Sequence, residues 1–283
     1  MELHLYLSQA FAQHALIAGA LVAITCGLIG PFVIMRNMAF AVHGTSELAF
    51  TGAAAGLLVA DDPIAGALIG AVVVAAIIGL LGERERERDS AIGVVLAFGL
   101  GLGVLLLSYY RGFATAATNI LFGDIFGIST NQIVLLVAIG AVAAIAMTLL
   151  HRPLLFASVD PDVAAARGLP VRLLGLSFLV ILALTVTAAA QIVGTLLVLS
   201  LAITPAAAAQ RFTAKPLVAT GLSVAFALIA TEGGLLASLQ SGTVKPSVFI
   251  TGISFAIYLL ARLLGPLILT RRPTSEAHDP AAS

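Results

Sequence analysis

A histidine and a glutamate stand four residues apart within an apolar stretch of the chain. His43 and Glu47 belong to the sequence MAFAVHGTSELAFTG at 38–52. Four residues are just over one helical turn, so the two side chains leave a helix on the same face. An imidazole and a carboxylate suit Zn²⁺, Mn²⁺ or Fe²⁺, and a carboxylate in hydrocarbon is costly unless it is paired, solvated or bound to a cation. The pair predicts a site for a divalent cation. The alternative is a structural His–Glu hydrogen bond that faces a neighbouring helix.

Three further polar residues interrupt apolar sequence and are weaker candidates. Glu232 is expected to line the outward end of a path, although simple solvation at a span end would also explain it. Gln191 and Thr204 lie within apolar runs, and Thr204 precedes Pro205. A proline frees a backbone carbonyl one turn earlier, which predicts a hinge or a polar spot in the wall, although packing explains many such prolines.

A short amphipathic helix is predicted within the polar segment 156–172. Asp160 is its expected N-cap, Pro161 takes the first helical position, Gly168 takes the left-handed position after the last turn, and Pro170 prevents continuation. One interpretation is a helix that docks into a groove on a cytoplasmic motor subunit. The other is a plain interfacial helix that lies on lipid headgroups.

These residues must be positioned by helices in a membrane. Hydrophobic residues make up 60% of the 283, charged residues make up 10%, and the mean hydropathy is +1.11, a composition that excludes soluble classes. The fold class is therefore an all-α polytopic transmembrane bundle over residues 1–272, with eight or nine spans. The division near 188–191 is the weakest, because no charge or proline separates two apolar runs there. The predicted spans are 12–35, 38–60, 63–82, 90–110, 132–150, 173–190, 192–210, 216–238 and 247–269.

The basic residues fall on alternate loops, which predicts the orientation of the chain. By the positive-inside rule these loops face the cytoplasm, and so does the C-terminus. The charged run at 83–89 predicts a solvated cytoplasmic turn, or else a contact with a nucleotide-binding domain. Residues 273–283 predict a disordered polar tail, and residues 1–13 lack the features of a signal peptide. The basic positions are Arg36, Arg84, Arg86, Arg88, the segment 151–172, Arg211, Lys215, Arg271 and Arg272.

Composition also excludes several functions. The 14 basic and 14 acidic residues cancel, so nothing favours nucleic acid as a partner. The single cysteine, Cys26, excludes an intramolecular disulfide and a multi-thiolate zinc site. No phosphate-binding loop occurs, so any energy from ATP must come from another polypeptide. No serine–histidine or paired-aspartate arrangement predicts an intramembrane hydrolase.

Four segments in order give the chain a family resemblance. They are PFVIMRNMAF at 31–40, DSAIGVV at 89–95, LFGDIFG at 121–127 and QIVGTLLVLSLAITPAA at 191–207. Together they resemble the integral-membrane permeases of ABC importers for zinc, manganese and ferrous iron. The family pattern in the second span has an aspartate and a histidine four residues apart as its metal-handling pair. Here His43 and Glu47 occupy those positions, so imidazole and carboxylate have exchanged places.

The resemblance implies a transport subunit of the bacterial plasma membrane that has no intrinsic cofactor. Its partners would be a cytoplasmic ATPase pair that binds the ATP, an extracytoplasmic metal-binding protein and a second permease copy. The cargo would be zinc or manganese. By the same resemblance, 159–170 matches the coupling helix of the family. The residues of that helix expected to matter are Asp160, Pro161, Asp162, Ala165, Arg167 and Gly168.

Two other kinds of transporter fit parts of the pattern. In a secondary carrier an ion gradient would drive transport, and His43 and Glu47 would relay protons as well as metal. An ABC permease for a metal chelate or a vitamin would need a wider path and no metal-ligand pair.

Overall fold

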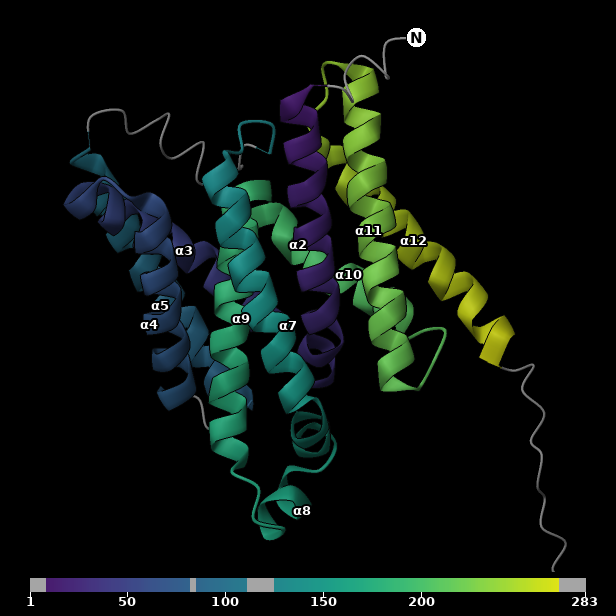
Figure 1. The fold of residues 1–283 in the computed structure, drawn as a ribbon. Coiled ribbons are helices and arrows are strands. Elements are labelled where there is room, and N and C mark those ends of the chain that lie inside the picture. The colour runs from purple at the N-terminus through teal and green to yellow at the C-terminus, as the bar shows by residue number, and fades with distance from the viewer. Residues whose placement is uncertain (1–8, 82–84, 111–124, 270–283) are drawn as a thin grey trace, which may run out of the picture.

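The chain folds into a bundle of α-helices. A computed structural model describes residues 9–81, 85–110 and 125–269, and every regular element within these ranges is helical. Figure 1 shows long helices side by side, with one short helix, α8, protruding at one end. The elements are α2 (Ala10–Met35), α3 (Ala39–Ala60), α4 (Pro63–Leu81), α5 (Glu85–Ser108), α7 (Thr130–Val159), α8 (Pro161–Ala166), α9 (Val171–Val193), α10 (Thr195–Ala209), α11 (Pro216–Ser241) and α12 (Pro246–Leu269).

Seven of these helices are long and apolar enough to cross a membrane: α2, α4, α5, α7, α9, α11 and α12. The all-α membrane bundle predicted from composition is thereby confirmed. The other two predicted spans correspond to α3 and α10, which are less apolar or shorter than these seven. Helix α3 has 22 residues but carries His43, Glu47 and several hydroxyl side chains, which lower its hydropathy. Helix α10 has only 15 residues, about 22 Å of helix at 1.5 Å per residue.

Packing shifts several boundaries away from the predicted positions. The expected division near 188–191 falls instead at Gly194, with φ 88° and ψ 153°, a conformation open mainly to glycine. Helix α7 continues past residue 150, through Pro153, to Val159. Its extension persists because Leu154 and Ala157 are buried in the core. The charged run predicted as a turn contributes residues 85–89 to α5, and residues 82–84 and the predicted tail lie outside the described ranges.

Helices α2 and α9 form the centre of the bundle, and the outer helices present apolar side chains outward. Buried residues make up 67% of the spanning window of α2 and 61% of that of α9, against 22% for α5, α7 and α12. Large apolar side chains on the outer helices are strongly exposed, such as Phe98 of α5, Leu149 of α7 and Leu263 of α12. So much exposed apolar surface is stable only in lipid or against another membrane protein.

Helix α3 is held against α4 and α5 by very close backbone contacts. A Cβ atom on Gly66 of α4 would lie 2.4 Å from the carbonyl oxygen of Gly52 and 2.5 Å from the Cα atom of Gly56, both in α3. On the α5 side, the Thr51 hydroxyl donates a hydrogen bond of 2.7 Å to the Gly99 carbonyl oxygen. Such small-residue contacts allow helices to pack closely in lipid, and here they fix the helix that carries His43 and Glu47.

Candidate functional site

His43 and Glu47 lie in the first half of α3, one helical turn apart. Both side chains are half-buried, whereas Thr45, Ser46 and Leu48 around them are buried. The Ser46 hydroxyl donates to the His43 carbonyl oxygen at 2.9 Å, so it does not occupy the imidazole. The imidazole and the carboxylate therefore keep accessible surface on the same face of α3, as their spacing predicts.

No hydrogen bond or ion pair joins His43 to Glu47 within the described residues. The structural His–Glu hydrogen bond considered from the sequence is not formed. The His43 imidazole lies beside the Phe40 ring, with ring centroids 6.3 Å apart. Both groups thus have free ligand capacity in the described part of the chain.

The described chain adds no third metal ligand to this pair. Among the residues that the structure describes, no group of three or more His, Cys, Asp or Glu side chains is placed to hold a metal ion. Zn²⁺ takes four ligands and Mn²⁺ favours more, mostly oxygen. A cation held by this pair would take its other ligands from water or from a residue of another chain, and such a site would bind weakly.

The weaker candidates from the sequence do not gather around this pair. Glu232 lies on α11, where its Oε1 atom is buried without a hydrogen-bond partner among the described residues and faces Gly19 of α2. Helix α11 packs against α2, α10 and α12, whereas α3 packs chiefly against α4, α5, α9 and α10 (Figure 1). Gln191 lines a small cavity with Gln132 where α4, α7 and α9 meet. Thr204 is half-buried on α10.

The short helix predicted after the fifth span is present as α8, and its start and stop signals act as expected. The Asp160 carboxylate accepts a hydrogen bond from the Val163 amide at 3.0 Å, and Pro161 is the first helical residue. Gly168 has φ +82°, and the Leu169 amide donates to the Ala164 carbonyl oxygen at 3.1 Å. The local start and stop signals of the sequence therefore coincide with the ends of this helix.

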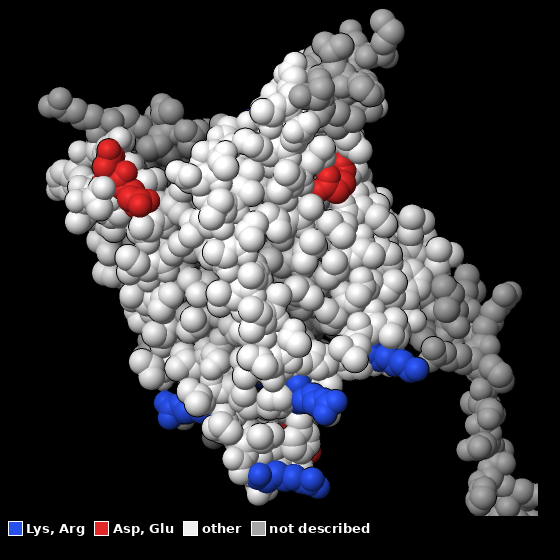
Figure 2. Space-filling model, in the orientation of Figure 1, with Lys and Arg blue, Asp and Glu red and all other residues white. Residues whose placement is uncertain are grey.

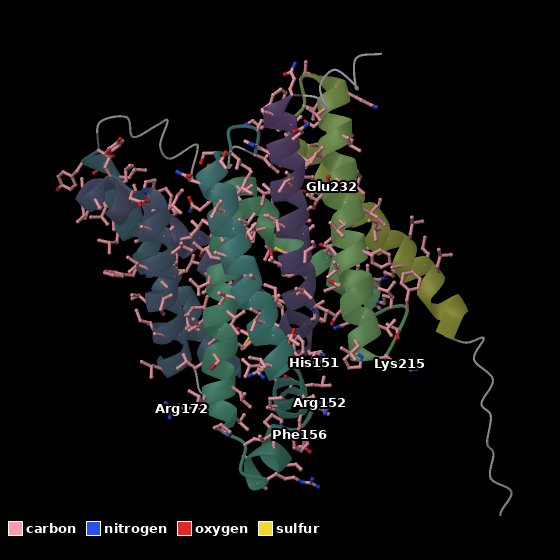
Figure 3. The ribbon with its side chains drawn as sticks, viewed as in Figure 1. His151, Arg152, Phe156, Arg172, Lys215 and Glu232 are labelled. Atoms are coloured by element: carbon pink, nitrogen blue, oxygen red, sulfur yellow. The ribbon has the colours of Figure 1, made fainter. Side chains whose placement is uncertain are left out.

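Helix α8 presents most of its surface outward at one end of the bundle. Of its six residues only Ala164 is buried, and Val163 is 44% exposed. Lysine and arginine side chains gather at this end of the molecule on the face drawn in Figure 2. Figure 3 labels Arg152, Arg172 and Lys215 there, and Glu232 in the other half of the bundle. An exposed valine on a protruding helix is suited to contact with another protein or with lipid headgroups.

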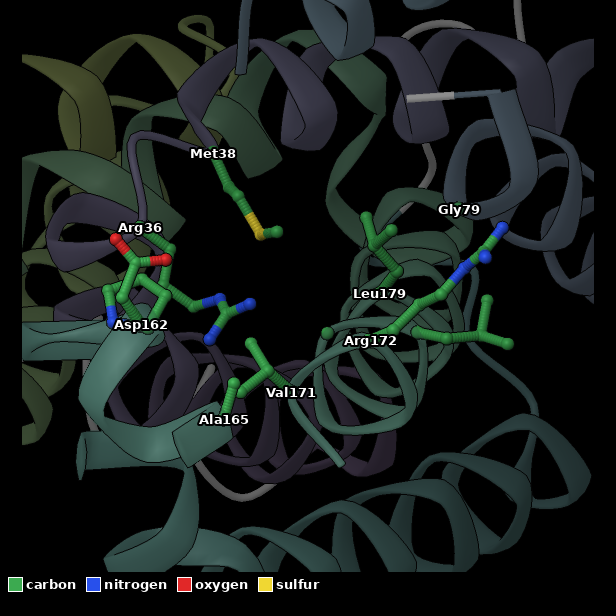
Figure 4. A pocket seen from close by; sticks show the side chains of 11 residues that line it. Arg36, Met38, Gly79, Asp162, Ala165, Val171, Arg172 and Leu179 are labelled. Atoms are coloured by element: carbon green, nitrogen blue, oxygen red, sulfur yellow. The ribbon is translucent and has the colours of Figure 1, made fainter. Parts of the chain in front are cut away.

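A cavity of about 440 Å³ lies between α8 and the ends of α2, α4 and α9. Figure 4 shows the Arg36 guanidinium and the Met38 side chain directed into it. The sequence places Arg36 only among the basic residues of one side. The one sign of a special role in the sequence is that this arginine directly follows an apolar run. The sequence does not reveal its partners, Ser158 and Phe178, because they lie more than 100 positions away.

Known proteins that are similar to this chain in sequence or in structure match it over nearly its whole length. The sequence model of the ABC 3 transport family matches residues 8–265. The manganese transport system membrane protein MntC of Halalkalibacterium halodurans is 32% identical over 268 residues, covering 94% of this chain and 91% of that protein. The high-affinity zinc uptake system membrane protein ZnuB of Haemophilus influenzae is 28% identical and covers 88% and 96%. The solved structure of PsaBC from Streptococcus pneumoniae in complex with Fab superimposes with a TM-score of 0.84, at 28% identity, and covers 95% and 97%.

Proposed function

The chain belongs to the ABC 3 transport family, and from this membership we propose that it is the membrane-spanning subunit of an ATP-driven importer of manganese or zinc. The observation that carries the proposal is the family match over residues 8–265. Relatives named for manganese and for zinc transport both align with most of the chain. The chain is a transport subunit and not an enzyme, and ATP is hydrolysed on a separate subunit.

In the proposed topology nine helices cross the membrane, and α8 lies in the cytoplasm. The seven long apolar helices are seven of these nine. The eighth is α3, which tolerates polar residues because it is packed against α4 and α5. The ninth is α10, a short helix after the break at Gly194. Arg152, Arg172 and Lys215 lie at the end where α8 protrudes (Figure 3), which supports a cytoplasmic position for that end. The C-terminus is then also cytoplasmic.

The cation passes His43 and Glu47 on its way through the membrane. Two half-buried ligands on one face of α3, with no third in the described chain, support a site that binds briefly and releases, as transport requires. The exchange of imidazole and carboxylate relative to the family pattern keeps the ligand types. Nitrogen and oxygen ligands of this kind accept either manganese or zinc.

The remaining subunits supply what this chain lacks. An extracytoplasmic metal-binding protein delivers the ion, a second copy of the permease forms the other wall of the path, and a pair of cytoplasmic ATPase subunits binds α8. Closure of the ATPase pair on ATP moves α8 and reshapes the path from outward-facing to inward-facing. The exposed Val163 and the outward-facing residues of α8 support its role as the docking element.

Growth under metal limitation tests the proposed function. A strain that lacks this gene is expected to stop growing in medium depleted of manganese and zinc, and micromolar addition of the transported ion is expected to restore growth only when the gene is present. Cell-associated metal, measured by mass spectrometry, identifies the ion. Restoration by a metal chelate or a vitamin, with no difference for the free ions, would contradict the proposal.

A further inference from the structure

Arg36 joins three helices at the cytoplasmic end of the bundle. It directly follows α2, and its Nη1 atom donates a hydrogen bond of 3.1 Å to the Ser158 hydroxyl of α7. Its guanidinium carbon lies 5.8 Å from the centre of the Phe178 ring of α9. A Cβ atom on Gly175 of α9 would lie 3.2 Å from its Nη2 atom. One half-buried cation is thus held between α7 and α9.

The hydrogen bond between Arg36 and Ser158 links two residues that are close in sequence to α3 and to α8, the two helices of the proposed mechanism. Ser158 is the penultimate residue of α7, and α8 starts at Pro161. On the other side, Arg36 is followed by Asn37, with φ 51°, and by Met38, the N-cap of α3. The Met38 amide donates to the Val33 carbonyl oxygen at 2.8 Å. This tight turn ties Arg36 closely to the start of α3, the helix that carries the metal pair.

Helix α8 has space to move beside this connection. The cavity of about 440 Å³ is lined by Arg36 and Met38 and by Asp162 and Ala165 of α8, and Figure 4 shows Asp162 beside Arg36. Only Ala164 anchors α8 in the core. Helix α8 can therefore shift into this space before it meets close-packed side chains, and one residue, Asp160, separates it from the end of α7.

We propose that Arg36 is a positioning residue that transmits the displacement of α8 to α3. This inference rests on the proposed function. When the ATPase pair moves α8, the end of α7 moves with it, and the hydrogen bond from Arg36 to Ser158 carries that motion to the turn before α3. A hydrogen bond from a charged donor in a partly buried site is stronger than a neutral one in water. The ring of Phe178 holds the guanidinium at that position.

The test measures transported metal per ATP hydrolysed. The complete complex of permease, ATPase subunits and metal-binding protein is placed in proteoliposomes, and radioactive manganese or zinc uptake is measured together with phosphate release. Arg36→Gln is expected to keep ATPase binding and hydrolysis but to lower the metal-per-ATP ratio about tenfold, within the roughly 5–150-fold range of typical coupling between sites. Arg36→Lys, which keeps the charge and a donor, is expected to restore most of the ratio.

A matched control and a second variant make the result decisive. Arg152→Gln removes an exposed arginine at the same end of α7 and is expected to leave the ratio unchanged. Ser158→Ala removes the acceptor of the Arg36 hydrogen bond, together with the hydroxyl's own hydrogen bond to the Leu154 carbonyl oxygen within α7, and should lower the ratio in the same direction. If the Arg36→Gln complex does not assemble, the ratio measured for Ser158→Ala tests the inference instead. The double variant should be no worse than Arg36→Gln alone.

Two outcomes would overturn the inference. One is a wild-type ratio in Ser158→Ala and in any assembled Arg36→Gln complex. The other is a proportional loss of hydrolysis and uptake, which indicates a purely structural role. A wild-type complex that moves no metal with ATP would instead contradict the proposed function, so the two failures are distinguishable.

Discussion

Replacing both His43 and Glu47 by alanine is expected to reduce metal uptake by at least about 100-fold, because loss of an outer-sphere partner alone typically costs about 10–100-fold in metal affinity or activity. The two side chains are the only ligand pair for which α3 provides both an imidazole and a carboxylate on one face. Their half-buried position means that alanine leaves little void in the core. Membrane insertion and binding of the ATPase subunits should remain normal. Uptake of radioactive manganese and zinc into metal-depleted cells measures the effect.

A matched control removes the same chemical groups elsewhere. His14→Ala with Asp61→Asn deletes one half-buried imidazole on α2 and one exposed carboxylate after α3. This control is expected to retain uptake within about twofold, in keeping with the small effects of most substitutions away from a functional group. Normal uptake by the His43/Glu47 double variant would eliminate the proposed site.

Val163→Glu on α8 is expected to lower the amount of ATPase that co-purifies with the permease by about 30-fold or more. Val163 is 44% exposed at the protruding end of the bundle, and a buried apolar anchor at an interface is commonly worth about 2 kcal/mol or more. The substitution should not unfold α8, because the cap from Asp160 uses the Val163 backbone amide and not its side chain. Co-purification from detergent extracts, followed by ATP-dependent uptake, measures the loss.

Val244→Glu is the control for that experiment. Val244 is 38% exposed in the turn between α11 and α12, and this turn lies at the opposite end of the bundle from α8 (Figure 1). The glutamate adds the same charge to a similarly exposed valine, so the ATPase should still co-purify in full. If Val163→Glu retained the ATPase as well as Val244→Glu does, α8 would not be the docking element.

The sequence predicts well those features that depend on neighbouring residues. Apolar runs of span length identify the long helices, and Asp160, Pro161 and Gly168 fix the ends of α8 because their effects act within one turn. The placement of His43 and Glu47 on one face follows from helical geometry alone.

Features that depend on distant contacts could not be predicted in this way. Ala189 and Ala190 are buried against other helices, and the helix continues past them and ends at Val193, before Gly194. The continuation of α7 through Pro153 depends on packing of its last turns in the core. Arg36 has partners at Ser158 and Phe178 that only the folded bundle brings together.

The separation of Glu232 from His43 and Glu47 has the same origin. Glu47 and Glu232 both lie in apolar sequence, and the local pattern alone predicts a functional role equally for each carboxylate. Their distance is set by the arrangement of helices, in which α11 packs on α2 while α3 packs on α4 and α5 (Figure 1). One carboxylate keeps accessible surface beside an imidazole, and the other has an oxygen buried against Gly19.

Whether ATP drives the transport is measured by accumulation of free manganese or zinc in proteoliposomes that contain the permease with its ATPase subunits and its metal-binding protein. We expect accumulation against a metal gradient that requires ATP and persists when ionophores abolish proton and sodium gradients. Accumulation by the permease alone, driven by an ion gradient and indifferent to ATP, would contradict it and would indicate a secondary carrier.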